Sequence, residues 1–271
     1  MMDVEEKIME MRKDHVHGSS WYFSTISRLL ENIDSQGLAI IASSLRSIRP
    51  GMGGISNVDE LLSKIPENDT VAARKLGEKL LMYYESSEVK LRKNAPKMNG
   101  KRVMSISYSS SVKYSIEKSP PDILYLLESR PGKEVGAAYR DYSKYCEVKV
   151  VPDSTMLSFM NSTDMVITGF DGLFSDGTLT NKIGTYPLFL CAMEAGVEII
   201  AVGESFKSSL RQFENFPEIS ATLLGRRCKV PLLERVPLTY VKMLITDSGI
   251  FNDPDSSTVI SLHESFVKML S

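Results

Sequence analysis

The chain has 271 residues, of which 42% are hydrophobic and 24% are charged, so its length fits one large domain or two smaller ones. A formal charge of −2 at pH 7 provides no overall attraction for nucleic acid, and no run approaches the roughly 18 apolar residues of a membrane span. Cys146, Cys191 and Cys228 are odd in number and widely spaced, a pattern that indicates neither a disulfide framework nor a zinc site. We therefore expect a soluble globular protein of a reducing cytoplasm, with no membrane partner and no nucleic-acid partner.

Residues 1–98 have the apolar spacing of amphipathic helices and are predicted to form a helical N-terminal domain. Ser19 or Ser20 is the expected N-cap of the second helix, since serine oxygens accept hydrogen bonds from free N–H groups. Pro50 is expected to end the third helix, because proline cannot continue one. The predicted helices cover residues 3–14, 19–33, 36–48, 57–65 and 70–91.

A basic segment without periodicity, residues 90–102, is predicted to be a linker, and the pattern changes beyond it. Short apolar segments then alternate with stretches long enough for a helix, as parallel strands with helical crossovers require. The sequence therefore predicts an α/β fold in which residues 99–271 form a Rossmann-like domain with a doubly wound parallel sheet. The predicted strands cover residues 102–107, 122–127, 147–151, 164–168 and 197–202.

Polar residues follow four of these strands at the point where each one ends. They are Ser107, Arg130, Asp153 and Asp171. A capping role would explain each residue alone. The carboxyl ends of parallel strands share one rim, however, and open α/β sheets bind ligands there. The set of four therefore favours a crevice over separate caps.

The stretch from residue 164 to 187 combines an apolar strand, a polar loop and a predicted helix start. Asp171 lies in the loop, and Asn181 and Lys182 are placed where the helix is expected to begin. A helix start offers free backbone N–H groups to an anion. This order predicts an anion-binding loop that combines a carboxylate, an amide and a lysine.

Other sites find less support. The glycine-rich residues 50–56 follow a helix and not a strand, so they are predicted to be a plain loop and not a dinucleotide fingerprint. His15 and His17 form H-x-H, but only His263 remains to join them, whereas zinc sites usually recruit three or four ligands. We expect neither a metal nor a cofactor, and the alternative that His17 faces a phosphate stays open.

Several segments together resemble one family, that of the eukaryotic initiation factor 2B alpha, beta and delta subunits and their archaeal counterparts. The segments are SISYSSSV, ESRP, PDST, DMVITGFDGLFSDGTLTNKIGTYPLFLCAMEAGV, VGESFK and VPLTYVKMLITDSGIF. The family also includes methylthioribose-1-phosphate isomerase and archaeal ribose-1,5-bisphosphate isomerase. The resemblance implies a cytoplasmic homodimer or higher oligomer that associates through its Rossmann-like domain. It also implies the alpha subunit of initiation factor 2 as a protein partner.

The resemblance also assigns roles within the predicted crevice. In the isomerases a cysteine at the end of the first strand and an aspartate of a G-A-D motif form an acid/base pair. Asp171 matches that aspartate and the pair Asn181-Lys182 matches an N-K motif, but Ser107 takes the cysteine position. A thiol exchanges protons near neutrality, whereas a serine hydroxyl is a far weaker acid. Two motifs that are expected to bind phosphate in the isomerases differ as well. This chain has His17-Gly18-Ser19 where the isomerases have R-G-A, and ESRPGKEVG where they have E-[ST]-R-P-x-x-Q-G.

These departures favour a non-catalytic, initiation factor 2B-like regulatory or binding protein that retains a sugar-phosphate or nucleotide pocket. The alternative is an aldose-ketose isomerase similar to ribose-1,5-bisphosphate isomerase, with Asp171 and Ser107 as its catalytic residues. A structural dimer module with an empty crevice is a third interpretation. The expected ligand-binding residues are Arg49, Ser107, Arg130, Asp171, Asn181 and Lys182. A retained pocket requires Ser107 and Asp171 to face one cavity, with Arg130 and Lys182 on its wall.

Overall fold

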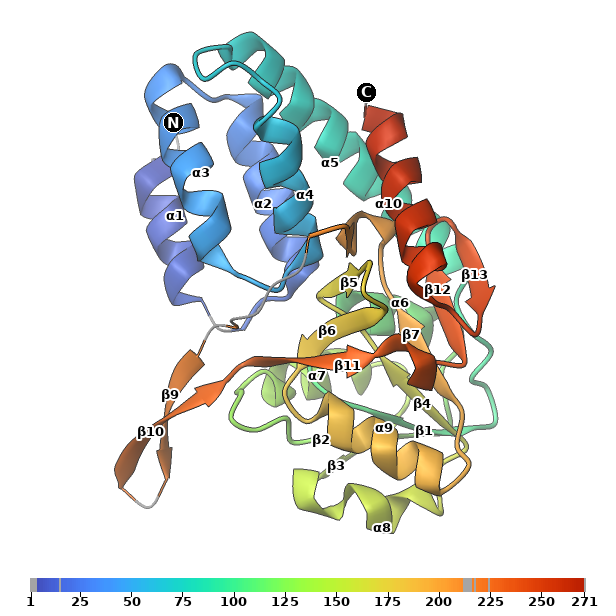
Figure 1. Ribbon diagram of the computed structural model, residues 1–271. Helices are drawn as coiled ribbons and strands as arrows, with labels where there is room; N and C mark the ends of the chain where they lie inside the picture. Colours follow the sequence, from blue (N-terminus) through green and yellow to red (C-terminus); the bar gives the residue numbers. More distant parts are fainter. Residues whose placement is uncertain (1–3, 15, 212–215, 217, 224, 271) are drawn as a thin grey trace.

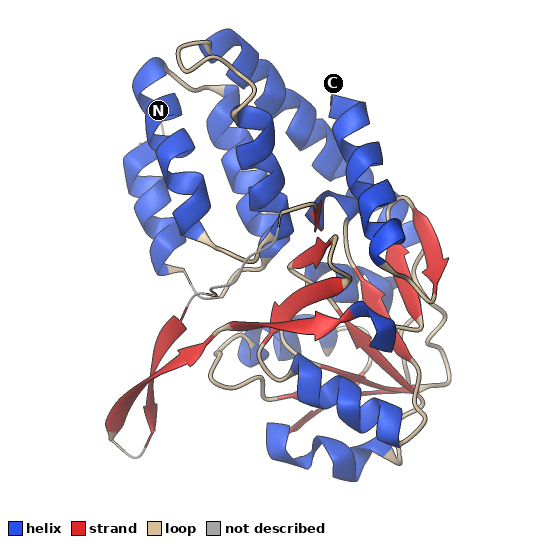
Figure 2. Cartoon of the chain, in the orientation of Figure 1, coloured by secondary structure: helices blue, strands red, loops and turns tan. Residues whose placement is uncertain are grey.

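The protein consists of a helical array packed on a mostly parallel sheet, so the predicted α/β fold is confirmed (Figures 1 and 2). The computed structural model describes residues 4–14, 16–211, 216, 218–223 and 225–270. The helices of the array are α1 (Val4–Lys13), α2 (Ser19–Glu31), α3 (Ser35–Ile48), α4 (Gly53–Leu62) and α5 (Thr70–Lys93). Each was predicted from its apolar spacing.

Two details of the helical array differ from prediction. Gly18, and neither serine, is the N-cap of α2, and the helix start is capped from the sheet domain, where Asp171 Oδ1 accepts from the Ser19 N–H. The Ser20 hydroxyl instead donates to Glu204 of the sheet domain. Helix α4 begins at Gly53, inside the predicted loop. The backbone at this residue lies against the main chain of Lys207. A Cβ at Gly53 would lie 1.8 Å from the Lys207 carbonyl oxygen, so only glycine permits this approach.

The central sheet has seven strands in the order β13-β12-β7-β4-β1-β2-β3, all parallel except β13. Five of the strands were predicted, but the last two along the chain, β12 and β13, were not assigned to this sheet. Because the chain passes from β1 outward to β3 and then returns beside β1 with β4, the strand order reverses between β1 and β4. The strands are β1 (Arg102–Ser105), β2 (Ile123–Leu127), β3 (Glu147–Val151), β4 (Met165–Thr168), β7 (Ile199–Val202), β12 (Met243–Thr246) and β13 (Gly249–Asn252).

Helices cover both faces of this sheet, as a doubly wound fold requires. One face packs on α6 (Ser110–Lys118) and α7 (Val135–Tyr142). The other packs on α8 (Met156–Met160), α9 (Thr185–Glu194) and α10 (Ser256–Leu270). The 3-10 helices are η1 (Asp153–Thr155), η2 (Ser205–Lys207) and η3 (Leu238–Tyr240).

The predicted order of strand, loop and helix start between residues 164 and 187 is wrong in one respect. A β-hairpin stands between the loop and the helix, so Asn181 and Lys182 lie on strand β6 and helix α9 begins only at Thr185. The turn of the hairpin contains Gly177, whose φ of 78° suits glycine. The hairpin belongs to a four-stranded sheet with order β11-β6-β5-β8, made of β5 (Gly172–Phe174), β6 (Thr178–Lys182), β8 (Ser208–Ser209) and β11 (Leu233–Pro237).

The helical array and the sheet domain share apolar side chains. Phe206, Phe266 and Leu270 are buried in the same cluster as the array's own core, and Phe23 stacks on Phe206 with ring centroids 3.9 Å apart. Helix α10 accordingly lies beside α5 in Figure 1. The division into residues 1–98 and 99–271 remains a prediction.

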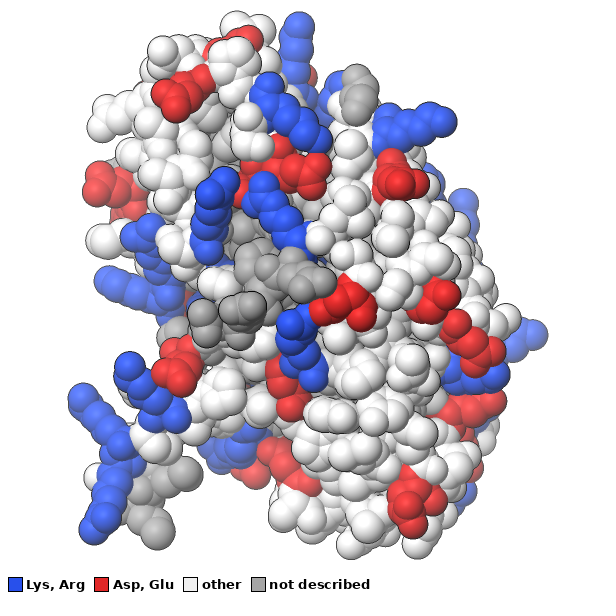
Figure 3. Space-filling model, in the orientation of Figure 1, with Lys and Arg blue, Asp and Glu red and all other residues white. Residues whose placement is uncertain are grey.

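A separate two-stranded hairpin, β9 (Glu218–Leu223) and β10 (Arg226–Pro231), projects from the body of the molecule (Figures 1 and 3). Arg226, Arg227 and Lys229 are exposed on it, which gives the arm a basic surface. Among the helices of the described part of the chain, none has the length and apolar character needed to cross a membrane.

Candidate functional site

A cavity of about 360 Å³ lies between the start of α2 and the carboxyl edge of the sheet. Its place next to β1 and β4 is where the strand order reverses, the position at which open α/β sheets bind ligands. The volume is within the usual range for small-molecule sites. The polar and charged residues that line it are His17, Ser19, Ser20, Ser24, Arg28, Arg49, Tyr84, Ser107, Tyr108, Ser109, Ser110, Glu134, Asp171, Asn181, Lys182 and Lys207.

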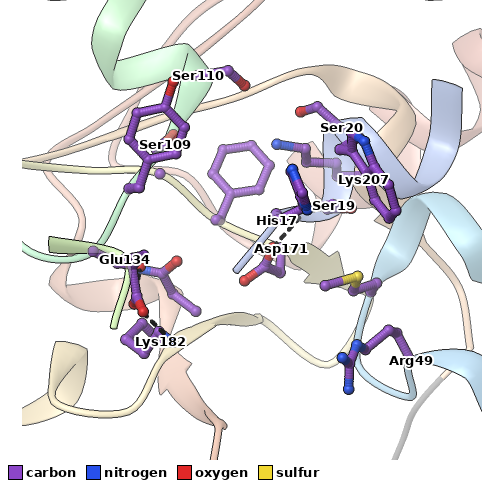
Figure 4. Close-up of a pocket in the computed structure, with 18 of the residues that line it drawn as sticks. His17, Ser19, Ser20, Arg49, Ser109, Ser110, Glu134, Asp171, Lys182 and Lys207 are labelled. Carbon is purple, nitrogen blue, oxygen red and sulfur yellow. Dashed lines mark hydrogen bonds and ion pairs between the residues drawn. The ribbon is translucent and has the colours of Figure 1, made fainter. Parts of the chain in front are cut away.

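Asp171 lies at the centre of the labelled side chains in Figure 4. Its main-chain N–H donates to the carbonyl of Thr180 at 2.7 Å, and its own carbonyl accepts from the N–H of Gly53 at 3.0 Å. The carboxylate Oδ1 accepts from the N–H of Ser19 at 3.1 Å. Burial raises the pKa of Asp171, and the opposing effects of Lys207 and the Ser19 N–H do not cancel that rise. The residue is therefore fixed in position and holds its proton more tightly than an ordinary aspartate.

Ser107 is half-buried and belongs to a polar cluster on one wall of the cavity. Its hydroxyl donates to Oε1 of Glu134 at 2.8 Å, and the same oxygen pairs with Nζ of Lys182, also at 2.8 Å. The Lys182 and Glu134 side chains are only 8% and 2% exposed. The backbone of Ser107 has a φ of 66°, a conformation that is uncommon outside glycine, and its N–H donates to the hydroxyl of Ser129.

A second buried ion pair lies toward the helical array. Nζ of Lys207 is 2.7 Å from Oε2 of Glu204, and the two side chains are 4% and 2% exposed. The hydroxyls of Ser20 and Ser111 also donate to Glu204. Burial alone would raise the pKa of Glu204, but Lys207 and Ser20 outweigh it and lower that pKa. Both lysines of the cavity are thus matched with a buried carboxylate.

Arg49 and the start of α2 form the opposite side. Figure 4 shows Arg49 across Asp171 from the pair of Glu134 and Lys182. Nε of Arg49 donates to the Tyr22 hydroxyl at 2.8 Å. The hydroxyl oxygen of Ser19 is buried and has no hydrogen-bond partner within the described residues.

The structure brings together five of the six predicted ligand-binding residues: Arg49, Ser107, Asp171, Asn181 and Lys182. Asn181 donates to the Thr185 hydroxyl at 3.0 Å. The sixth, Arg130, does not line the cavity, so the prediction that it lies on the cavity wall is wrong. Its side chain is 64% exposed and pairs with Glu128, and its main-chain N–H donates to Asp153.

The members of the two buried ion pairs other than Lys182, namely Glu134, Glu204 and Lys207, were not predicted for the site. Glu134 takes the glutamine position of the E-[ST]-R-P-x-x-Q-G pattern, so the departure in that motif was the signal for it. Glu204 and Lys207 follow β7, a fifth strand end, at which no site residue was predicted. As for metals, no group of three or more His, Cys, Asp or Glu within the described ranges could hold an ion, and His15 lies outside those ranges.

The fold and the cavity define an α/β protein with a ligand site where its parallel sheet changes direction. The model of the initiation factor 2 subunit family (IF-2B) matches residues 24–253, and the chain belongs to that family. A translation initiation factor eIF-2B subunit 2-like protein of Pyrococcus furiosus is 23% identical over 265 residues, which cover 90% of this chain and 95% of that protein.

Two further comparisons show the range of the relatives. A ribose 1,5-bisphosphate isomerase of Archaeoglobus fulgidus is 31% identical over 116 residues, which cover 38% of this chain and 37% of the isomerase. The crystal structure of translation initiation factor eIF-2B from Pyrococcus horikoshii OT3 has the same fold, with a TM-score of 0.83 at 23% identity, over 94% of this chain and 98% of that one. Factor-like proteins and a sugar-phosphate isomerase are thus both related to this chain.

Proposed function

We propose that this protein is an initiation factor 2B-like regulatory or binding protein whose cavity holds a phosphorylated small molecule, a sugar phosphate or a nucleotide, without converting it. The observation that carries this proposal is the environment of Ser107. Its hydroxyl donates to Glu134 at the position where the related isomerases are expected to have a thiol. A serine hydroxyl does not exchange protons readily near neutrality, so half of the acid/base pair is weakened.

The phosphate group of the ligand is assigned to the side of the cavity formed by Arg49 and the first turn of α2. An arginine fork matches phosphate geometry, and a helix start offers the positive end of its dipole and the N–H groups beyond that of Ser19, which Asp171 already accepts. The buried Ser19 hydroxyl, which has no partner in the described structure, would donate to a phosphate oxygen. Asp171 and Ser107 would then face the hydroxyl groups of the ligand.

The raised pKa of Asp171 favours a second candidate, the aldose-ketose isomerase. In such a reaction one group removes a proton from carbon while another delivers a proton to the carbonyl oxygen. A desolvated carboxyl whose pKa is raised above its ordinary value holds and returns a proton more readily than an exposed aspartate, as such a role requires. This candidate requires a second acid/base group to replace the thiol.

The proposed protein partner is the alpha subunit of initiation factor 2, and the proposed assembly is a cytoplasmic homodimer or higher oligomer formed through the sheet domain. Exposed apolar side chains support a contact surface there. Leu157 of α8 is 52% exposed, and Leu190 and Met193 of the neighbouring α9 are 48% and 52% exposed.

Calorimetric titration with ribose 5-phosphate, and with ribose as the control ligand, tests the proposed binding. We expect the phosphorylated sugar to bind at least about tenfold more tightly, and Arg49→Lys to weaken its binding by about tenfold because the fork is lost. Arg130→Lys is the matched control, since that residue points away from the cavity, and should leave binding unchanged.

Incubation with ribose 1,5-bisphosphate tests for catalysis. We expect no ribulose 1,5-bisphosphate to form; turnover that Asp171→Asn abolishes would establish the isomerase instead. If no phosphorylated ligand binds and the initiation factor 2 alpha subunit is not retained on the immobilised protein, only a structural role remains.

A further inference from the structure

The cluster of Ser107, Glu134 and Lys182 forms one wall of the cavity. From it we infer that Glu134 is a specificity residue that excludes a second phosphate, so the ligand is a monophosphorylated polyhydroxy compound and not a bisphosphate. This inference rests on the proposed function, because it specifies the ligand of the same cavity.

The first reason is that the charge of Lys182 is already matched. Its Nζ lies 2.8 Å from Oε1 of Glu134, and both side chains are more than nine-tenths buried. A phosphate at this wall would have to separate a buried ion pair and leave Glu134 without its cation, which is unfavourable. Lys207, the other lysine of the cavity, is matched with Glu204 at 2.7 Å in the same way. Neither lysine is available as a free cation to a second phosphate at this wall, and Arg28, the other arginine that lines the cavity besides Arg49, belongs to α2 on the opposite side.

The second reason is the direction of the hydrogen bonds. The Ser107 hydroxyl gives its hydrogen to Glu134, so its remaining lone pairs make it an acceptor toward the cavity. Asp171, when ionised, is also an acceptor. A sugar hydroxyl can donate to both groups, whereas a phosphate dianion has no hydrogen to donate and is repelled by the carboxylates. This wall therefore suits the hydroxyl end of a ligand.

The position of Glu134 is built into the local backbone. A Cβ at Gly132 would lie 2.1 Å from Oε2 of Glu134, so the glycine makes room for the carboxylate. Glu134 also precedes the first residue of α7, which anchors its main chain. In the motif pattern described above, a neutral glutamine stands at this position, and a glutamine would leave Lys182 unmatched.

Calorimetric titration of the wild-type protein with ribose 5-phosphate and ribose 1,5-bisphosphate tests the inference. We expect the monophosphate to bind more tightly by about tenfold or more, since like charges are brought together by the bisphosphate. In Glu134→Gln the preference should reverse, with bisphosphate binding improved by about tenfold or more relative to the wild type.

Glu128→Gln is the matched control, because it removes a carboxylate from the same segment that pairs with the exposed Arg130. It should leave both affinities unchanged. The ratio of the two wild-type affinities decides the matter even if Glu134→Gln does not fold. Bisphosphate binding as tight as monophosphate binding in the wild type overturns this inference and leaves the proposed function intact, whereas binding of neither ligand overturns the proposed function.

Discussion

At the scale of single residues, the raised pKa of Asp171 predicts how stability depends on pH. Burial makes the folded state hold this proton more tightly than the unfolded state, where the pKa is near 3.8. The ionised carboxylate therefore lowers the free energy of unfolding at pH values above the raised pKa. Asp171→Asn should increase that free energy at pH 7 by about 1 kcal/mol, a size common for stabilising replacements in binding sites, and raise the Tm by roughly 2–4 °C.

Thermal unfolding of both proteins between pH 4 and pH 8 measures this effect. The advantage of Asp171→Asn should shrink as the pH falls through the raised pKa and disappear well below pH 3.8, where the wild-type carboxyl is protonated in both states. Asp141 is the control, and its effect on the free energy of unfolding should have the opposite sign, because hydrogen bonds from Lys144 and Tyr108 lower its pKa to about 2. Asp141→Asn should reduce the Tm at pH 7, and the deficit should shrink as the pH falls. An advantage of Asp171→Asn that does not change with pH would exclude titration of Asp171 as its cause.

Residue positions in the site were predictable where the main chain alone determines them. Asp171 and Ser107 follow the neighbouring strands β4 and β1, so the sheet brings them to one rim whatever their side chains do. Arg130 follows β2 in the same manner, but its long side chain turns outward to Glu128. Glu134 enters the site through its contact with Lys182, which is 48 positions further along the chain. Periodicity and strand ends carry no information on such contacts.

At the scale of elements, the start of α4 determines how closely the helical array approaches the sheet domain. A Cβ at Gly53 would collide with the main-chain carbonyl of Lys207, which cannot move as freely as a side chain can. Gly53→Ala should therefore lower the free energy of unfolding by about 3 kcal/mol or more. It should also weaken ligand binding, since Lys207 lines the cavity.

Urea denaturation of Gly53→Ala and of Gly136→Ala compares this glycine with one that has space around it. A Cβ at Gly136 meets nothing closer than 3.7 Å, and the residue lies inside α7. Gly136→Ala should raise the free energy of unfolding by about 0.5–1 kcal/mol through its better helix propensity. Equal effects of the two substitutions would show that the close approach at Gly53 is not needed.

The helices and parallel strands were predictable because each carries a local apolar period, but the β5–β6 hairpin was missed. Its turn contains Asp176 and Gly177, a dipeptide typical of hairpins, and the short strands around it were interpreted as a loop. Strands β12 and β13 were not assigned because β12 pairs with β7, about 40 residues earlier in the chain, and β13 joins the sheet only through β12. Pairing over such distances is determined by tertiary packing and not by local sequence.

At the scale of the whole molecule, the helical array and the sheet domain share a core and should unfold together. Phe206 and Phe266 are buried among the side chains of the array, and Asn57 of α4 donates to the carbonyls of Phe206 and Ser208 at 2.7 Å each. Unfolding the array alone would expose these aromatic rings and leave both buried carbonyls without their donor. Each of these losses costs free energy.

Trp21, the only tryptophan of the chain, reports on the array through its fluorescence, and labelling of the Cys191 thiol, detected by mass spectrometry, reports on the sheet domain. In a urea titration the two midpoints should coincide, since a single cooperative transition moves all probes together. Asn57→Ala should lower both midpoints equally, by an amount equivalent to about 1–3 kcal/mol, because two buried carbonyls lose their donor. A Trp21 transition at lower urea than that of Cys191, with Asn57→Ala affecting only the former, would instead show that residues 1–98 unfold as a separate domain. The shared cluster would then be a contact between two independent cores.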